Sequence, residues 1–340
     1  MVRFAVAGLG VMGARHCRVI RALPSAVLVG VCDAYAAQAT SVARELQTRA
    51  FSNFDEMLAS PDVDAVVLCV PSGLHAELGI RVARAGKHVV VEKPLACDES
   101  AARALVAECE SHGVICAPIC QYRYSDGFRA LKWAVESGAL DRPVLVRASV
   151  KWFRHDEYYT GSHWRGRRAG EKGGVLINQS VHAFDLLHWL FGEPVDVAGF
   201  CHGSRPHVME MEDSAVAILR WRSGLLGTIE ASTSAAPGFD QSFEINSPAA
   251  TIRVEKQQVV YWWHKNGLRL PEGIRAPGEY EGVPDLDDRL LLFKMQYQNI
   301  IAAMATGAPL DALPGDAVAV VRTLDRVYAS AGYLGRERCE

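Results

Sequence analysis

The chain has 340 residues, of which 36 are lysine or arginine, 39 are aspartate or glutamate and 49% are hydrophobic. This length favours two domains over one, and the apolar share is that of an ordinary globular protein rather than a disordered one. The nearly neutral charge gives no indication of a basic surface for nucleic acid or an anionic membrane. We therefore expect neither of these partners.

The nine cysteines are odd in number and irregularly spaced, which favours free thiols in a reducing compartment. Cys116 and Cys120 have a spacing that suits metal ligands on a helix, but their apolar neighbours are typical of a buried strand, so we predict no metal site. The first apolar run reaches a glycine turn too early for a signal peptide, and no run approaches the length of a membrane span. The sequence therefore predicts a cytoplasmic protein.

The chain opens with the order strand, glycine turn, helix and strand. Residues 2–7 and 27–32 form short apolar runs on either side of the turn and a helical stretch. Gly8 permits a tight bend, Gly10 lets a pyrophosphate approach the backbone, and Gly13 lets the helix pack against the strand. The diphosphate would then lie at the positive end of the helix. The turn predicts a dinucleotide site made of Gly8, Leu9, Gly10, Val11, Met12 and Gly13.

Asp33 ends the second apolar run, 20 residues after Gly13. A carboxylate at this position accepts hydrogen bonds from the adenosine ribose diol and repels a 2′-phosphate. Ala34 and Tyr35 follow it and provide no cation for such a phosphate. These residues favour NAD over NADP, with the alternative that Asp33 only caps the next helix.

Strand and helix patterns continue to alternate up to residue 119. The expected strands are 64–70, 88–91 and 114–119, and the expected helices are 41–47, 75–85 and 100–112. Such repeats form a parallel sheet with right-handed crossovers, in which ligands bind beyond the carboxyl ends of the strands. The candidate cofactor contacts there are Cys69, Val70, Pro71, Ser72, His75, Glu92, Lys93 and Gln121. For His75, the alternative is that it only caps a helix.

Lys93 follows the expected strand 88–91, where a nicotinamide and its substrate would meet. Its ammonium group can polarise or hydrogen-bond a substrate oxygen, and a nearby nicotinamide cation would lower its pKa. The alternative is a solvated lysine at the end of a strand.

The pattern changes after Gln121. We expect a helix over 128–137, a strand over 143–152 and a polar, aromatic-rich loop over 154–172. A further helix opens at Gly173-Gly174 and continues to Leu190. It would carry Asn178, His182 and Asp185 on one face, because their spacings are four and three residues.

Six alternating stretches follow, at 195–202, 213–221, 225–233, 241–246, 250–254 and 258–263, and two helical stretches end the chain at 286–306 and 316–332. The strands predict a large, mostly antiparallel open sheet with helices on one face. Few elements remain to cover the other face, so we expect a homodimer or homotetramer. The sequence thus predicts an α/β protein. A Rossmann domain with a doubly wound parallel sheet, residues 1–121, precedes an α+β domain for substrate binding and oligomerisation, residues 122–340.

Three motifs follow one another along the chain, and the resemblance described below covers essentially its whole length. They are Gly8 to Gly13, the segment Glu92-Lys93-Pro94, and the helix start Gly173-Gly174 that leads to His182 and Asp185. In these motifs the chain resembles the glucose-fructose oxidoreductase, inositol dehydrogenase and rhizopine catabolism (Gfo/Idh/MocA) family. The resemblance implies a dinucleotide-binding domain, an open-sheet domain that forms dimers or tetramers, and hydride transfer between nicotinamide and a secondary alcohol of a sugar or cyclitol.

The resemblance also assigns roles to single residues. Lys93 would be the catalytic lysine and His182 the catalytic histidine. We expect His182 to act as the general base and Lys93 to stabilise the alkoxide-like oxygen, with the opposite assignment as the alternative. Asn178 is the third candidate catalytic residue. The family often has an aspartate at its position; an asparagine can orient a hydroxyl but cannot take its proton.

Other candidates have weaker patterns. Arg123, Asn178 and Asp185 are expected to bind substrate together with Lys93 and His182, although Asp185 can equally orient neighbouring groups. Trp164 and Arg165 are expected at the cofactor or at an anionic group, with loop packing as the alternative. The sequence from Asn178 to His182, with Tyr158-Tyr159, Trp164-Arg165-Gly166 and Glu212-Asp213, is similar to the branch of the family that acts on nucleotide-linked sugars. Alternatives are a dehydrogenase of a free inositol, an amino-cyclitol or a glycoside, and a non-catalytic NAD-binding regulator.

Overall fold

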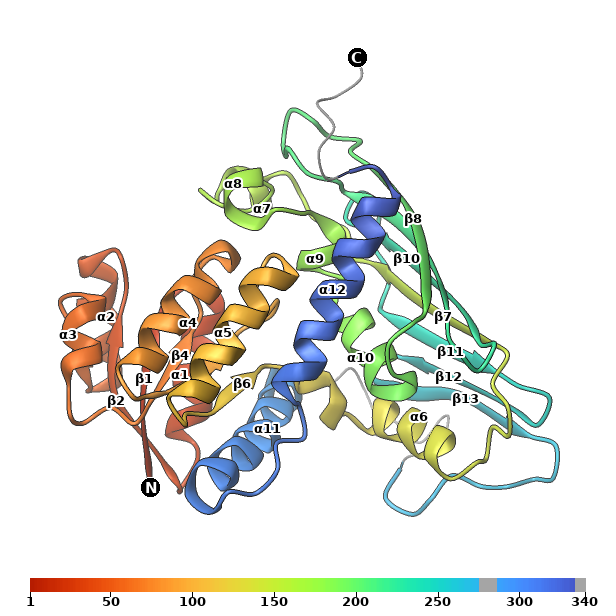
Figure 1. Cartoon of the computed structure of the whole chain (residues 1–340), viewed down its shortest axis with the longest axis horizontal. Helices are drawn as coiled ribbons and strands as arrows, with labels where there is room; N and C mark the ends of the chain where they lie inside the picture. Colours follow the sequence, from red (N-terminus) through yellow and green to blue (C-terminus); the bar gives the residue numbers. More distant parts are fainter. Residues whose placement is uncertain (275–285, 334–340) are drawn as a thin grey trace. The chain divides into compact units, whose positions relative to one another are not determined.

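The computed structural model describes residues 1–274 and 286–333, which divide into two compact units (Figure 1). Of these residues, 1–121 and 286–318 belong to the first unit, and 122–274 and 319–333 belong to the second. Residues 275–285 and 334–340 of the expected second domain lie outside the described part.

The first unit contains a six-stranded parallel sheet in the order β3-β2-β1-β4-β5-β6. The strands are β1 (Val2–Ala7), β2 (Ala26–Cys32), β3 (Arg49–Ala50), β4 (Ala65–Leu68), β5 (His88–Val91) and β6 (Cys116–Pro118). The helices between them are α1 (Val11–Arg21), α2 (Ala36–Leu46), α3 (Phe54–Ala59), α4 (His75–Arg84) and α5 (Glu99–Ser111). This strand order confirms the predicted doubly wound fold, and its direction reverses between β1 and β4, where such sheets bind their ligands.

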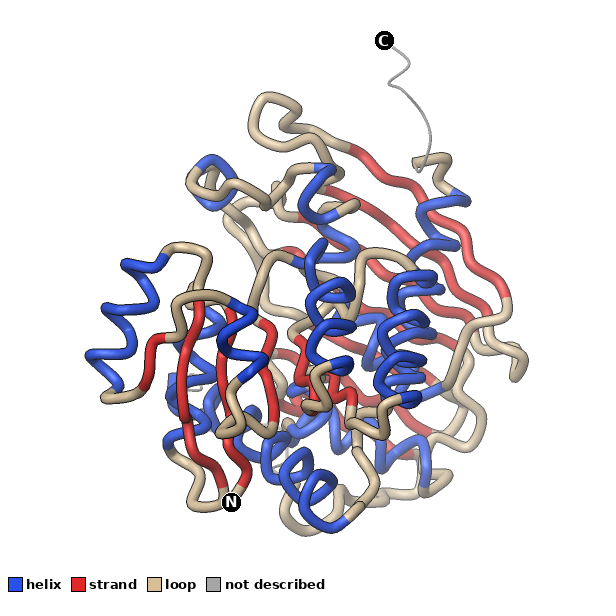
Figure 2. Tube along the Cα trace, turned by 60° about the vertical axis from the view of Figure 1, so that its left-hand side comes forward, coloured by secondary structure: helices blue, strands red, loops and turns tan. Residues whose placement is uncertain are grey.

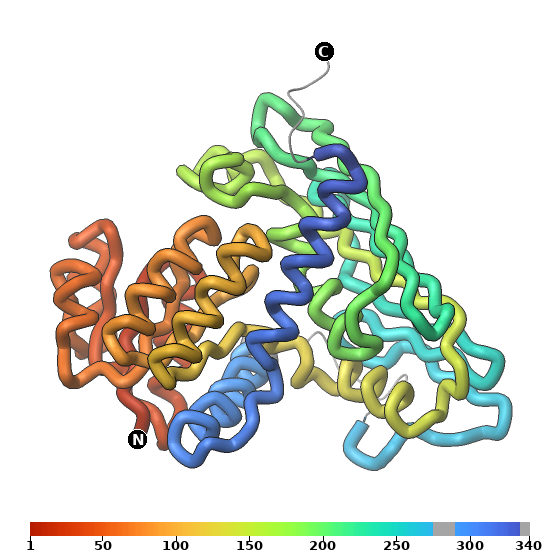
Figure 3. The backbone as a smooth tube through the Cα atoms, viewed as in Figure 1, coloured from red at the N-terminus to blue at the C-terminus, as the bar shows by residue number. Residues whose placement is uncertain are grey.

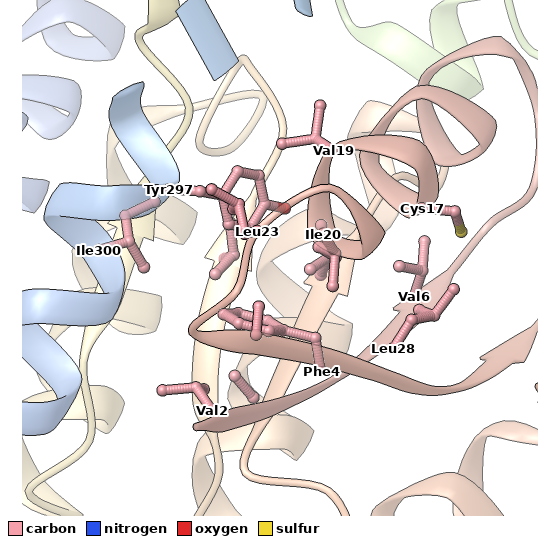
Figure 4. Packing of buried hydrophobic residues seen from close by; sticks show 14 of the residues in the cluster. Val2, Phe4, Val6, Cys17, Val19, Ile20, Leu23, Leu28, Tyr297 and Ile300 are labelled. Atoms are coloured by element: carbon pink, nitrogen blue, oxygen red, sulfur yellow. The ribbon is translucent and has the colours of Figure 1, made fainter. Parts of the chain in front are cut away.

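Helix α11 (Leu286–Thr306) belongs to the first unit, whereas the sequence assigned it to the second domain. Its residues Phe293, Tyr297, Ile300 and Ile301 recur at helical spacing and join the buried cluster of β1 and α1. Figure 4 shows Tyr297 and Ile300 among side chains of these elements, and Figure 3 shows α11 in light blue beside the red N-terminal trace. This helix therefore belongs to the first unit because its apolar stripe is buried against β1 and α1.

The second unit is built on a seven-stranded sheet in the order β13-β12-β11-β7-β10-β9-β8, drawn in red as one layer in Figure 2. The strands are β7 (Leu145–Lys151), β8 (Asp196–His202), β9 (Ser214–Arg220), β10 (Leu226–Ser232), β11 (Ser242–Asn246), β12 (Ala250–Glu255) and β13 (Gln258–His264). Every neighbouring pair is antiparallel except β10 and β7, which confirms the predicted, mostly antiparallel sheet.

Burial alternates along these strands, so the sheet has one covered and one open face. Helix α6 (Asp126–Glu136) packs on β12 and β13, and α10 (Val181–Phe191) packs on β7. On the opposite face Phe200 is 73% exposed and Ile218 is 52% exposed. The last helix of the described chain is α12 (Pro314–Ser330).

The prediction of one continuous helix from Gly173 to Leu190 is wrong, because two helices occupy this stretch. Helix α9 (Val175–Asn178) ends before α10 begins. The backbone N–H and the side-chain hydroxyl of Ser180 both donate to the carbonyl of Val175, at 2.9 and 3.0 Å. The carbonyl of Ser180 then accepts the first hydrogen bonds of α10. Asn178 consequently does not share a helical face with His182 and Asp185.

The loop expected over 154–172 contains two single-turn helices, α7 (Glu157–Thr160) and α8 (Arg168–Glu171). The sequence analysis also missed β3 and α3 in the first unit. All of these elements are too short to produce a periodic pattern.

Candidate functional site

The three glycines of the first turn are required for three different reasons. Gly8 has φ +86°, and a Cβ atom there would lie 2.5 Å from the carbonyl oxygen of Cys69. A Cβ at Gly13 would lie 1.9 Å from the carbonyl oxygen of Gly8, so only glycine lets α1 approach the strand. A Cβ at Gly10 would meet nothing within 4 Å. Gly10 therefore faces open space at the start of α1, where a pyrophosphate fits.

The environment of that helix end also suits an anion. Helix α1 begins at Val11 and has no acidic residue in its first turn. The unpaired N–H groups at a helix start carry partial positive charge. The turn of Leu9, Gly10, Val11 and Met12 therefore combines space and polarity for a phosphate group.

Asp33 lies directly beside this turn. Its Oδ2 accepts the backbone N–H of Leu9 at 2.7 Å, and its Oδ1 accepts that of Tyr35 at 2.9 Å. The N-cap residue of α2 is Tyr35, so Asp33 does not cap that helix, contrary to the alternative interpretation. Each carboxylate oxygen keeps a further lone pair, which can accept a hydrogen bond from a ribose hydroxyl.

His75 connects the ends of β4 and β5. Its Nδ1 lies 2.6 Å from the carbonyl oxygen of Pro94, and its Nε2 lies 3.0 Å from that of Val70. The ring thus contacts carbonyl groups of strand ends instead of capping the N–H groups of α4. Burial lowers the pKa of His75. The neighbouring candidates Cys69, Val70, Pro71 and Ser72 form the segment between β4 and α4, at the edge where the sheet reverses direction.

Lys93 follows directly after β5 and Glu92, at the same edge of the sheet. Its backbone N–H donates to Glu92 Oε2 at 3.1 Å. Glu92 is buried, and its Oε1 lies 2.8 Å from His16 Nε2. His16 is a buried residue of α1 that the sequence analysis did not select.

Gln121 ends the N-terminal segment of the first unit and is buried. Within the described residues its side-chain oxygen has no hydrogen-bond partner. A buried oxygen without a donor is unfavourable, and a bound ligand with an N–H or O–H group would satisfy it. Gln121 thus fits the role of a cofactor contact.

The second unit holds the candidate His182 on α10, buried and with its ring centroid 4.6 Å from that of Tyr122. Tyr122 was not selected from the sequence, although both of its neighbours were. Contact with an aromatic ring restricts the orientation of the imidazole.

Arg123 and Asp185 form a buried ion pair. The guanidinium donates to both carboxylate oxygens, at 3.1 and 2.6 Å, and the two side chains are 2% and 8% exposed. The sequence assigned both residues to substrate binding. In the structure their charged groups bind each other, which ties the chain around Tyr122 to the helix that carries His182.

Replacing Asp185 by asparagine should lower the free energy of unfolding by about 3 to 5 kcal/mol, because it removes the carboxylate charge that pairs with the buried Arg123 guanidinium. Urea unfolding followed by circular dichroism measures this change. Asp196→Asn is the matched control, since the pair of Asp196 with Arg220 is more than half exposed and should contribute little. Equal stability of the two variants would contradict the prediction.

Asn178 contacts a carboxylate that the sequence analysis missed. Its amide nitrogen donates to Glu171 Oε1, and its oxygen accepts from Gln179 Nε2 at 3.3 Å. Glu171 is 1% exposed, and its Oε2 accepts the N–H of Gly166 at 2.6 Å. The available signal in the sequence was the position of Glu171, an acid shortly before the Gly173-Gly174 turn.

Trp164 and Arg165 stack within their own loop. The Arg165 guanidinium lies over the Trp164 ring at 4.8 Å and over the Tyr158 ring at 4.9 Å. Arg154, four residues before Tyr158 in the sequence, also has its guanidinium 5.2 Å from the centre of the Tyr158 ring. The loop therefore presents cations and aromatic rings together.

The candidates form two groups. The glycine turn, Asp33, the contacts beyond β4, Lys93 and Gln121 lie in the first unit, whereas Arg123, Trp164, Arg165, Asn178, His182 and Asp185 lie in the second. In the part of the chain that the structure describes, no cluster of three His, Cys, Asp or Glu side chains could hold a metal ion. No helix in residues 1–274 and 286–333 has the length and hydropathy of a membrane span.

A doubly wound sheet with this glycine turn, acid and strand-end lysine defines a dinucleotide-binding oxidoreductase. Comparison with known proteins agrees: a family model described as "Oxidoreductase family, NAD-binding Rossmann fold" matches residues 2–119, and "GFO/IDH/MocA C-terminal domain" matches residues 128–253. The chain belongs to the Gfo/Idh/MocA oxidoreductase family, which confirms the resemblance of its motifs.

The chain is similar to dehydrogenases of cyclitols and to a solved dehydrogenase structure. The myo-inositol 2-dehydrogenase of Thermotoga maritima is 30% identical over 72% of each chain. The scyllo-inositol 2-dehydrogenase (NAD(+)) of Bacillus subtilis is 31% identical over 74% of this chain and 73% of its own. The WlbA dehydrogenase of Bordetella pertussis, solved with NADH and UDP-GlcNAcA, is 30% identical with a TM-score of 0.86, over 97% of this chain and 96% of its own.

Proposed function

We propose that the chain is an NAD-dependent dehydrogenase that acts on a secondary alcohol of a nucleotide-linked sugar. The observation that carries this proposal is the shared sheet edge of the first unit, where the open glycine turn, Asp33 and Lys93 all follow strand ends. Family membership supports the same activity.

The cofactor site is proposed from groups that match NAD. The N–H groups at the start of α1 would hold the pyrophosphate, and Asp33 would accept hydrogen bonds from the adenosine ribose. Gln121 Oε1 would accept a hydrogen bond from an N–H or O–H group of the cofactor. The remaining contacts are the residues 69–72, His75 and Glu92, with Trp164 and Arg165 from the second unit. Bound NAD supplies the acceptor and donor of hydride.

In the proposed mechanism, His182 accepts the proton of the substrate hydroxyl in the oxidising direction and returns it in the reducing direction. The neutral imidazole ring of a histidine can accept a proton and return it. Lys93 stabilises the developing negative charge on the same oxygen as an ammonium ion. Asn178 orients the hydroxyl, while the Arg123–Asp185 pair holds Tyr122 and α10 in place around His182.

A nucleotide-linked sugar is the preferred substrate because the 152–165 segment combines aromatic rings with arginines. Arg154 and Arg165 lie against Tyr158, and within the described residues the buried Arg154 Nε has no hydrogen-bond partner. Such groups suit phosphates and a planar base. WlbA, solved with UDP-GlcNAcA, is similar over nearly the whole chain.

A free cyclitol is the second candidate. It is favoured by the myo- and scyllo-inositol dehydrogenases that match about three quarters of the chain. A cyclitol has no phosphate for the arginines of the 152–165 segment, so these residues separate the two candidates.

We also propose a homodimer or homotetramer formed through the open face of the second sheet. Phe200, Ile218, Tyr261 and Trp263 on this face are each about half exposed or more. Apolar side chains gathered on one face mark an interface. A reducing, cytoplasmic location is our further prediction, supported by the free thiols of all described cysteines.

A substrate screen tests the activity. Nucleotide sugars, free sugars, cyclitols and glycosides are each incubated with NAD and with NADP, and reduced nicotinamide is followed by its absorbance. Reduction of NAD with a nucleotide sugar is the expected result. Tight NAD binding with no turnover of any alcohol would instead identify a non-catalytic regulator.

Replacing Asp33 by asparagine should shift the ratio of kcat/KM for NAD to that for NADP by about 10- to 100-fold toward NADP, because the variant loses a charged acceptor and its repulsion of a 2′-phosphate. The amide still accepts the Leu9 N–H, which keeps the turn in place. Steady-state kinetics with both cofactors measure the ratio. Asp55→Asn, an exposed acid outside the site, is the control, and an unchanged ratio in Asp33→Asn would contradict the assignment.

A further inference from the structure

His16 is a polar residue on the buried face of α1, one turn after the glycine turn. It is 0% exposed, and its neighbours Cys17, Val19 and Ile20 belong to the apolar cluster of the first unit. A buried imidazole is stable only if both ring nitrogens have partners. The partners of His16 therefore indicate why this position is polar.

Both nitrogens contact residues from distant parts of the chain. Nε2 lies 2.8 Å from Glu92 Oε1, and Nδ1 lies 2.8 Å from the hydroxyl of Tyr297 on α11. An ionised carboxylate only accepts hydrogen bonds, so Nε2 carries a proton and donates to Glu92. Nδ1 of the neutral ring then accepts the hydrogen of the Tyr297 hydroxyl.

The chain of hydrogen bonds ends at Lys93. Glu92 Oε2 accepts the backbone N–H of Lys93 at 3.1 Å, so the bonds run from Tyr297 through His16 and Glu92 to the lysine. On the other side of Lys93, the carbonyl of Pro94 is held by His75 at 2.6 Å. Buried side chains thus hold the backbone at Lys93 itself, through Glu92, and at the next residue, through His75.

We propose that Tyr297, His16 and Glu92 are positioning residues that hold Lys93 in its reactive orientation. The proposal rests on the catalytic role proposed for Lys93. It also links two distant segments of the chain: Tyr297 of α11, 281 residues after His16, provides the hydroxyl that bonds to Nδ1 of His16. The three side chains are buried and polar, as expected of a support that must keep one geometry.

Glu92 additionally places a negative charge beside Lys93. A neighbouring carboxylate stabilises the ammonium form, so its removal lowers the pKa of the lysine. If Lys93 acts as a cation, the loss of activity at high pH should then begin at a lower pH in a variant without this charge. His75 is also in electrostatic contact with Lys93, and it stays unchanged in such a variant.

The test uses Glu92→Gln, His16→Gln and Tyr297→Phe in the full-length protein. We expect Glu92→Gln to lower kcat by about 10- to 100-fold while the KM for NAD changes less than about three-fold, because misplacement of a reacting group affects turnover more than binding. The alkaline limb of its pH profile should move to lower pH. His16→Gln keeps a donor for Glu92 and should be milder, as should Tyr297→Phe, which removes one oxygen atom.

Lys87→Met is the matched control. This buried lysine donates to the carbonyls of Ser60 and Val63 at 2.8 and 2.7 Å, directly before β5. It should lower the melting temperature but leave the pH profile unchanged. If Glu92→Gln does not fold, the kcat of Tyr297→Phe tests positioning, because this variant keeps the charge of Glu92 and removes only the hydroxyl that bonds to His16.

The outcomes separate this inference from the proposed function. Lys93→Met with wild-type turnover would overturn the catalytic role and the positioning proposal with it. An inactive Lys93→Met together with a wild-type kcat and pH profile in Glu92→Gln would overturn positioning alone. In support, Glu92→Gln should add no further loss of activity in the Lys93→Met background, since it acts through the lysine.

Discussion

Replacing Lys93 by methionine is expected to lower kcat for alcohol oxidation by about 10²- to 10³-fold, because the variant loses the cation proposed to stabilise the substrate oxygen. Methionine has a similar length and no charge. The affinity for NAD should stay within a few-fold of wild type, since the glycine turn and Asp33 are untouched. Stopped-flow and steady-state absorbance of reduced nicotinamide give kcat, and fluorescence titration gives the Kd for NAD.

Two further measurements make this result specific. Lys93→Arg retains a positive charge in a larger, planar group, so it should recover only part of the lost activity. Melting temperatures of both variants show whether the lysine also supports the fold. Turnover of Lys93→Met within a few-fold of wild type, on every alcohol that the wild type oxidises, would remove Lys93 from the reaction.

Replacing His182 by asparagine should lower kcat by about 10²- to 10⁴-fold, the usual contribution of a general base. In the wild type, oxidation should become faster as pH rises and the general base loses its proton, because only the neutral ring accepts a proton. The variant should lose this acid limb while retaining slow turnover. The pH dependence of kcat from pH 5 to 9 is the measurement.

His188→Asn provides the matched control on the same helix. His188 is also buried, its Nε2 bonds to Thr323 Oγ1 at 2.9 Å, and burial lowers its pKa to about 3. It is therefore neutral throughout the range, and its loss should affect stability but leave the acid limb in place. The general-base assignment fails if His182→Asn keeps the acid limb or if His188→Asn removes it.

The first unit was predictable because its signals are local. Each of its longer strands is a run of buried apolar residues, and the turn between β1 and α1 needs glycine at Gly8 for its positive φ and at Gly13 because a Cβ there would meet the carbonyl of Gly8. Asp33 and Lys93 could be selected by their positions after strands. The strands of the second unit alternate in burial, which the sequence also displays.

The helix break after Asn178 was not predictable from periodicity. The residues around it keep the apolar pattern of a helix, but Ser180 bonds to Val175 and starts a new one. The expected polar face of Asn178, His182 and Asp185 therefore does not form. Asn178 instead bonds to Glu171, and Asp185 to Arg123.

By itself, the sequence determined the Rossmann unit, the open sheet and the family, because these depend on short-range pattern and on steric limits within a turn; it also proposed the candidate residues for the chemistry. Only the tertiary structure decided which polar side chains are partners. Helix α11 packs on β1 and α1 through apolar side chains, and this packing places the hydroxyl of Tyr297 beside His16. His16 in turn bonds to Glu92. Hydrogen-bond partners separated by many residues leave no periodic trace in a sequence, since burial selects them only after the chain has folded.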